Sequence, residues 1–139
     1  MAEFTITSEV QSTQSTLKSL YEFLIDFKNF KEIMPEDKVE NFEYDDTSCN
    51  FNIRGVTPLK VRLKDKQPFH LVVFESEGLA KFNFLLEAAF IGDENLKGQC
   101  QVKLHGDINP FIKMMAEKPL TQLVNTMALR LSQLNTASL

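Results

Sequence analysis

The sequence contains no tryptophan, only two cysteines and only two histidines, and each scarcity excludes something. Cys49 and Cys100 lie far apart and form no CxxC motif, so we expect two reduced thiols, with a disulfide as the alternative that the spacing leaves open. His70 and His105, even together with these cysteines, do not supply the three or four clustered ligands of a metal site. No glycine-rich phosphate loop is present either. We therefore predict no metal and no cofactor.

An excess of positive charge is also missing. The net charge is -4, whereas nucleic acids and anionic membrane surfaces attract basic proteins. The longest apolar run is far shorter than the roughly 20 residues that span a membrane. The first ten residues, MAEFTITSEV, lack the basic stretch and apolar block of a signal peptide. These features argue against a nucleic-acid partner and against integral membrane insertion, and they predict a cytoplasmic protein.

Phenylalanine is what the sequence has in abundance. Twelve Phe residues stand beside two Tyr, and 43% of the 139 residues are hydrophobic, which is enough for one sizeable core. No repeat, linker or low-complexity stretch interrupts the chain. We therefore predict a single domain over residues 1–139.

The N-terminal third predicts one strand and two helices. Residues 3–10 alternate as a half-buried strand does. Ser12 or Thr13 then offers an N-cap for a helix of about three turns. A shorter helical pattern runs over residues 26–34 and should end before Pro35, because proline disfavours the α conformation in the preceding residue.

The middle of the chain predicts six antiparallel strands joined by short turns. Their expected ranges are 39–44, 49–54, 59–64, 69–76, 81–91 and 97–107. Most have one apolar face, as in a sheet that covers a single core. The apolar faces of the last two strands contain Phe82, Phe84, Leu86, Ala88 and Phe90, and Cys100, Val102 and Leu104. The stretch FHLVVF is apolar on both faces, so the direction of His70 stays open.

A long helix is predicted over residues 109–134. Asn109 is its expected N-cap, and Pro110 falls at the first helical position, where its missing N–H costs nothing. Pro119 lies within the pattern, either as a bend that follows a curved sheet or as part of a movable gate beside Met114 and Met115. At 100° per residue the apolar stripe comprises Ile112, Met115, Ala116, Leu120, Leu123, Val124, Met127, Leu131 and Leu134.

This order of elements resembles that of the helix-grip fold in the START-like (SRPBCC) superfamily. Two local features also resemble small uncharacterised bacterial members of that group: the IMP sequence at Ile33–Pro35 and the sequence INPFIKMMAEKPL at Ile108–Leu120. The resemblance implies an α+β fold, with a seven-stranded curved antiparallel sheet around the C-terminal helix and two short helices between strands 1 and 2. It also implies a hydrophobic cavity between sheet and helix.

From the strand faces and the resemblance, we predict binding of a small hydrophobic or amphipathic ligand for carriage or sensing. Arg130, at the edge of the stripe, is expected either to point outward or to bind a ligand carboxylate. Pro119 is the expected kink or gate. The residues expected to line the cavity are Phe82, Phe84, Leu86, Phe90, Val102, Leu104, Met115, Leu123 and Met127.

Two other functions stay open. An enzyme of the cyclase or hydrolase kind would use the same cavity and would need a buried ionisable group, but no position matches a catalytic motif, so the sequence leans away from an enzyme. An interaction module or homodimer would combine a filled core with an exposed apolar patch. Candidates for that patch are FHLVVF, Phe111, Met114 and Leu129.

Overall fold

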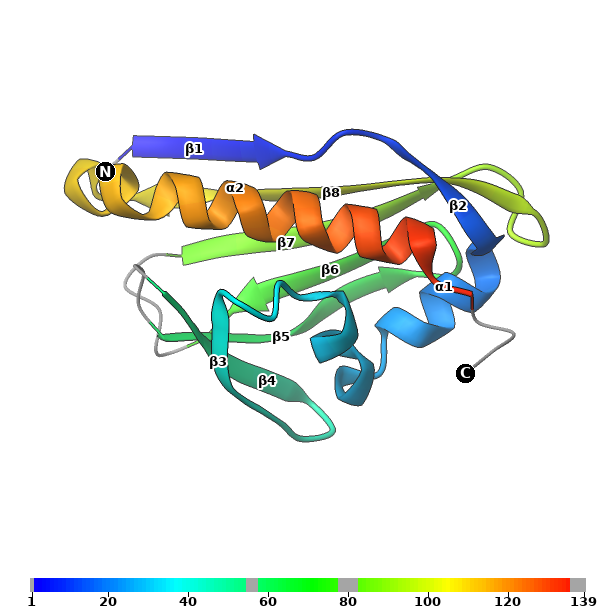
Figure 1. The fold of residues 1–139 in the computed structure, drawn as a ribbon, viewed down its shortest axis with the longest axis horizontal. Coiled ribbons are helices and arrows are strands. Elements are labelled where there is room, and N and C mark those ends of the chain that lie inside the picture. Colours follow the sequence, from blue (N-terminus) through cyan, green and yellow to red (C-terminus); the bar gives the residue numbers. More distant parts are fainter. Residues whose placement is uncertain (1, 55–57, 78–82, 136–139) are drawn as a thin grey trace.

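A computed structural model describes residues 2–54, 58–77 and 83–135. One antiparallel sheet curves beneath a long C-terminal helix, and two short helices close one end (Figure 1). The predicted α+β helix-grip architecture is confirmed. The elements are β1 (Ala2–Thr7), β2 (Gln11–Thr16), α1 (Leu17–Leu24), the 3₁₀ helix η1 (Phe27–Ile33), β3 (Val39–Tyr44), β4 (Ser48–Ile53), β5 (Pro58–Gln67), β6 (Leu71–Ser76), β7 (Asn83–Ile91), β8 (Lys97–Ile108) and α2 (Pro110–Gln133).

The predicted first strand, residues 3–10, corresponds to β1, but the segment predicted to begin the first helix forms a further strand, β2, and both β1 and β2 pair with β8. Among the described residues the sheet therefore has eight strands instead of seven, and the two short helices lie between β2 and β3. The prediction of a helix N-cap at Ser12 or Thr13 was wrong. Thr16 is the cap, and its hydroxyl accepts a hydrogen bond from the Ser19 N–H. The sequence QSTQST has no apolar residues, so hydrophobic alternation could not predict this strand. Its buried face consists of Thr13 and Ser15, whose hydroxyls form hydrogen bonds with backbone groups distant in the chain.

The sheet has the order β1-β8-β7-β6-β5-β4-β3, with β2 extending the β1 edge. The six predicted strands from residue 39 onward are all present, and β3 coincides with its predicted range. Every ladder is antiparallel, as short turns require. The inner faces of β7 and β8 are the predicted ones, with buried residues alternating along both strands.

Gly106 permits the closest approach within this sheet. A Cβ atom at this position would lie 2.0 Å from the carbonyl oxygen of Asn83 in β7. A side chain there would force β7 and β8 apart, so the ladder in this region depends on glycine.

Helix α2 begins as predicted. Asn109 is its N-cap, accepting a hydrogen bond from the Phe111 N–H at 2.8 Å, and Pro110 follows. The helix continues through Pro119 without a break in its assignment. It packs over β8, β2 and β1, at one side of the sheet (Figure 1). None of the described helices is long and apolar enough to cross a membrane.

Candidate functional site

Seven of the predicted cavity residues lie on facing surfaces of the sheet and α2. Phe84, Leu86 and Phe90 come from β7, Val102 and Leu104 from β8, and Leu123 and Met127 from α2. All seven are between 0% and 4% exposed. Phe82 lies outside the described residues. A side chain beside an open cavity would retain exposed area toward it, so the interior around these seven residues is closely packed.

Helix η1 contributes to this packing, although the sequence predicted only its presence and not its contacts with the sheet. Its Phe30 ring lies 5.2 Å from the ring of Phe74 in β6 and 6.4 Å from that of Phe51 in β4. Phe27 lies 5.7 Å from Phe74. Tilted and edge-on aromatic pairs of this kind add stability beyond their buried area. These rings pack η1 against the inner face of β4 and β6.

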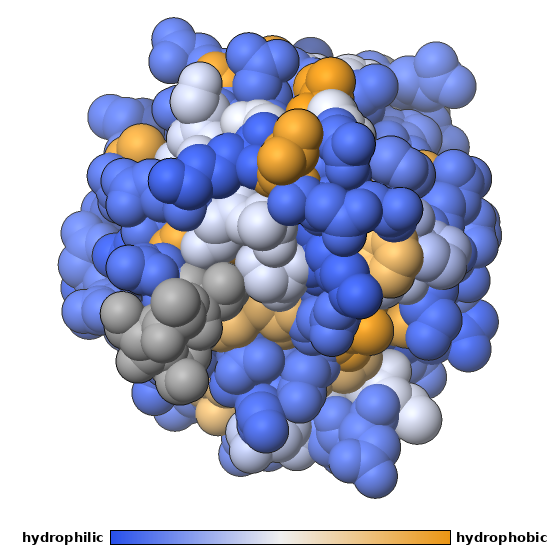
Figure 2. All heavy atoms as spheres, turned by 90° about the vertical axis from the view of Figure 1, so that its right-hand side faces the viewer, coloured by the Kyte–Doolittle hydropathy of each residue, from blue (hydrophilic) through white to orange (hydrophobic). Residues whose placement is uncertain are grey.

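The first turns of α2 extend away from the core. Phe111 is 79% exposed, Met114 82% and Met115 67%. The predicted inward stripe was therefore wrong at Met115, and the fully buried part of the helix begins at Ala116. The opposite end of the molecule is mostly hydrophilic, with hydrophobic atoms in separate small areas (Figure 2).

A hollow of about 220 Å³ lies beneath this part of α2, between the helix and β1. Phe4, Ile6, Ile108 and Leu120 supply apolar lining. Charged residues at the same hollow are Glu3, Lys113 and Glu117. The four apolar side chains are at most 9% exposed, so they form the base of a hollow whose surface is mostly polar, a combination that suits an amphipathic molecule.

Arg130 does not line this hollow. Its guanidinium donates a hydrogen bond of 2.5 Å to the carbonyl oxygen of Met34, at the end of η1, and lies 3.7 Å from the Glu36 carboxylate. The side chain therefore links α2 to the segment between η1 and β3. The sequence predicted that Arg130 would either point outward or bind a ligand carboxylate. In the structure its guanidinium instead binds the backbone carbonyl of Met34.

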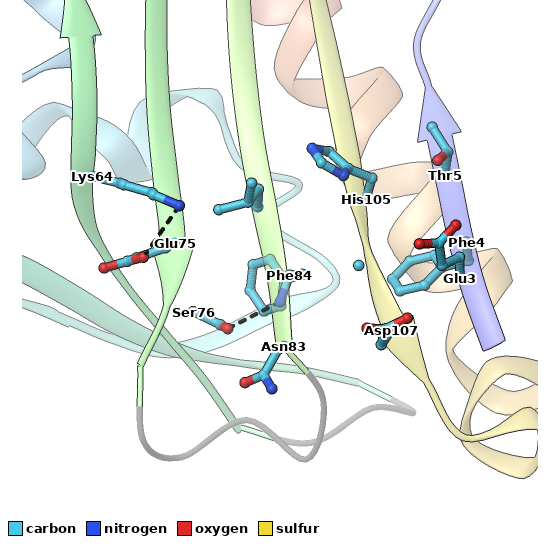
Figure 3. Close-up of a pocket in the computed structure, with 12 residues that line it drawn as sticks. Glu3, Phe4, Thr5, Lys64, Glu75, Ser76, Asn83, Phe84, His105 and Asp107 are labelled. Atoms are coloured by element: carbon cyan, nitrogen blue, oxygen red, sulfur yellow. Dashed lines mark hydrogen bonds and ion pairs between the residues drawn. The ribbon is translucent and has the colours of Figure 1, made fainter. Parts of the chain in front are cut away.

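A larger hollow of about 450 Å³ occupies the opposite face of the sheet (Figure 3). The strand register places Glu75, Leu85, His105 and Thr5 in one row across four strands. His105 is partly exposed, with its Nε2 atom 3.6 Å from the Glu87 carboxylate. His70, whose direction the sequence left open, is exposed in the turn before β6.

The described buried residues include two thiols, and both cysteines are free. Burial raises the pKa of the Cys49 thiol to about 12, with a smaller contribution from the Asp45 charge, and burial raises that of Cys100 to about 11. Both thiols are consequently protonated at neutral pH and chemically unreactive. Within the described ranges, no cluster of three or more His, Cys, Asp or Glu could hold a metal ion.

Comparison with solved structures places this geometry in a known class. A truncated norcoclaurine synthase from Thalictrum flavum matches 94% of this chain over 92% of its own, with 12% identity and a TM-score of 0.68. A START superfamily protein from Mycobacterium smegmatis matches 91% of this chain over 96% of its own, with 10% identity and a TM-score of 0.63. The Zhui aromatase/cyclase from a Streptomyces species matches 94% of each chain, with 11% identity and a TM-score of 0.62.

No protein-family model matches the sequence, and no curated protein does either. At these identities the structural matches establish the fold. The chain therefore has the helix-grip fold of these solved structures, as the resemblance seen in the sequence implied. Two of these three matched proteins are enzymes by name, the norcoclaurine synthase and the aromatase/cyclase.

Proposed function

We propose that this protein binds a small amphipathic molecule between β1 and α2. The hollow beneath the first half of α2 carries the proposal, because four apolar side chains line it and Lys113 stands at its rim. Burial of ligand surface there would contribute about 25 cal/mol per Å², before the costs of ordering. A ligand carboxylate would pair with the Lys113 ammonium group, and because Glu3 and Glu117 at the same hollow would oppose it, its binding would depend on that pair.

The hollow is smaller than the usual range of about 300–1,000 Å³ for ligand pockets. At about 220 Å³ it holds one end of a lipid-sized molecule, and the remainder requires the helix to move. The segment Pro110–Pro119 is suited to that movement. Pro119 has no N–H to donate to the Met115 carbonyl, so one hydrogen bond fewer holds this half of the helix to the next.

Titration with a fluorescent fatty acid and with the corresponding fatty alcohol tests this proposal. Lys113→Gln should weaken binding of the acid about tenfold and leave the alcohol unchanged, since only the acid has a charge to pair. Lys118→Gln is the matched control, because Lys118 is exposed on the same helix and lies outside the hollow. Equal losses in both variants, or no binding of either probe, would contradict the proposed site.

The exposed apolar turns of α2 favour a second function, self-association through Phe111, Met114 and Met115. The packed interior and the exposed patch are the two features expected of an interaction module. Sedimentation velocity tests this function: Phe111→Ser with Met115→Ser should dissociate a dimer, while Leu129→Ser, farther along the helix, should not. A wild-type monomer at all concentrations would exclude it.

A further inference from the structure

Strand β3 presents three apolar residues on one face because of a β-bulge. Val39 and Tyr44 are paired with the buried residues Ile53 and Cys49, so both point inward. They are five positions apart, however, and strict alternation would place them on opposite faces. The register shifts between Glu40 and Glu43, and Asn41 adopts a φ of 55° there.

The extra residue of the bulge restores the alternation in β3. Phe42 then points inward as well, and its ring stacks on Phe51 at 6.4 Å. Left-handed backbone in a non-glycine residue costs about 1 kcal/mol or more and tends to occur where a site needs it. Here the bulge at Asn41 brings two aromatic side chains, Phe42 and Tyr44, to the inner face of β3, an edge strand. Their ring centres are 6.1 Å apart.

The inner face of β3 is exposed to solvent at its last residue, Tyr44. Tyr44 is 55% exposed, and beside it lies a hollow of about 730 Å³ between the β3–β4 turn and the end of α1 with the start of η1. In Figure 1 this turn lies below η1. The lining combines the ring of Tyr44 with the side chains of Ile25 and Phe27. Phe27 is 4% exposed, so Tyr44 and Ile25 supply most of the apolar surface of this hollow.

The charged lining of this hollow is mostly negative. It comprises four carboxylates and one ammonium group: Glu22, Asp26, Asp45 and Asp46 with Lys28. The Lys28 ammonium lies 3.6 Å from Asp26 and partly neutralises it. Asp45 accepts hydrogen bonds from the Thr47 and Ser48 backbone N–H groups, which lower the pKa of its carboxyl and keep it ionised. Among the described residues, Glu22 and Asp46 have no ion-pair partner.

We propose that this hollow is a second binding site and that its ligand is a small aromatic cation. The ring system would lie against Tyr44 and Ile25, and the positive charge would face Glu22 and Asp46. A cation close to the exposed Tyr44 ring gains further attraction from the ring electrons. An aromatic anion would meet three uncompensated carboxylates instead. The site is separate from the hollow beneath α2, because the two share no residue.

The test compares two fluorescent aromatic probes of opposite charge, proflavine as the cation and 8-anilinonaphthalene-1-sulfonate as the anion. Wild-type protein should bind proflavine with an affinity that falls as salt concentration rises. Tyr44→Ala should weaken proflavine binding about tenfold, and Tyr44→Phe should retain most of it. The fold should tolerate both changes, because the side chain is 55% exposed, and thermal unfolding would verify this.

Charge variants separate this site from general attraction by an acidic protein. Glu22→Gln with Asp46→Asn should weaken proflavine binding about tenfold and flatten its salt dependence. Glu9→Gln with Glu43→Gln is the matched control, because it removes the same charge from two exposed residues outside the hollow that form no ion pair within the described part of the chain. Equal effects of both pairs would overturn the proposal, as would insensitivity to Tyr44→Ala or tighter binding of the anionic probe.

Discussion

Cys49 and Cys100 are both 0% exposed, and their environments explain their chemistry. The Cys100 thiol donates a hydrogen bond of 3.6 Å to the Ala128 carbonyl oxygen of α2, which only the protonated form can do. Removal of the proton would leave a charge in an apolar interior, and the pKa of each thiol rises accordingly. The expectation of reduced thiols follows from this burial as well as from the absence of a CxxC motif.

These raised pKa values predict a loss of stability at alkaline pH. In the unfolded chain a thiol ionises near pH 8.5, whereas the folded values are about 12 and about 11. Above pH 8.5 the unfolded state therefore binds fewer protons, and the free energy of unfolding falls by about 1.4 kcal/mol per thiol for each further pH unit. Urea unfolding in reductant between pH 8.5 and 10 would measure this slope. The Cys49→Ala, Cys100→Ala double variant should lose it, and an unchanged slope would contradict the assignment.

At the scale of elements, α2 shows how far local rules extend. Its start follows from Asn109 and Pro110, because capping depends only on neighbouring residues. The position where it meets the sheet does not, since the first turns reach past the core and leave Met115 exposed. The short helix η1 is a similar case: its boundary before Pro35 follows from sequence, while its packing against β4 and β6 depends on residues distant in the chain.

Pro119→Ala tests whether the interruption in α2 serves movement. Alanine restores the N–H donor to the Met115 carbonyl, so the variant should be more stable by roughly 1–3 kcal/mol. If the first half of α2 must move for binding, association of a fluorescent fatty acid should be slower in the same variant. Stopped-flow fluorescence measures this rate. A stabilised variant with an unchanged rate would mean that Pro119 shapes the helix without controlling access.

At the scale of the whole molecule, the interior is packed by segments that lie far apart in sequence. Leu123 of α2 is 1% exposed, and Leu104 of β8 is 0% exposed. A larger side chain at position 123 would have no room. Leu123→Trp should therefore destabilise the protein by about 1–3 kcal/mol.

Leu129→Trp is the control for that variant, because Leu129 is 43% exposed on the same helix and should change stability by less than about 0.5 kcal/mol. Chemical denaturation of both variants measures the difference. Equal stability of Leu123→Trp and wild type would reveal an open cavity beside Leu123, and the ligand would then bind deeper than the hollow at β1.

With the exception of β2, the sequence by itself determined the order of elements, and it also determined the cap of α2 and the inner faces of β7 and β8. Each depends on period, capping or turn residues, which act over a few positions. The tertiary structure alone decided where α2 lies on the sheet, how η1 fills the core and why Arg130 binds the Met34 carbonyl. It also decided the bulge at Asn41. These features depend on which distant segments meet, and that requires the packing of the whole chain.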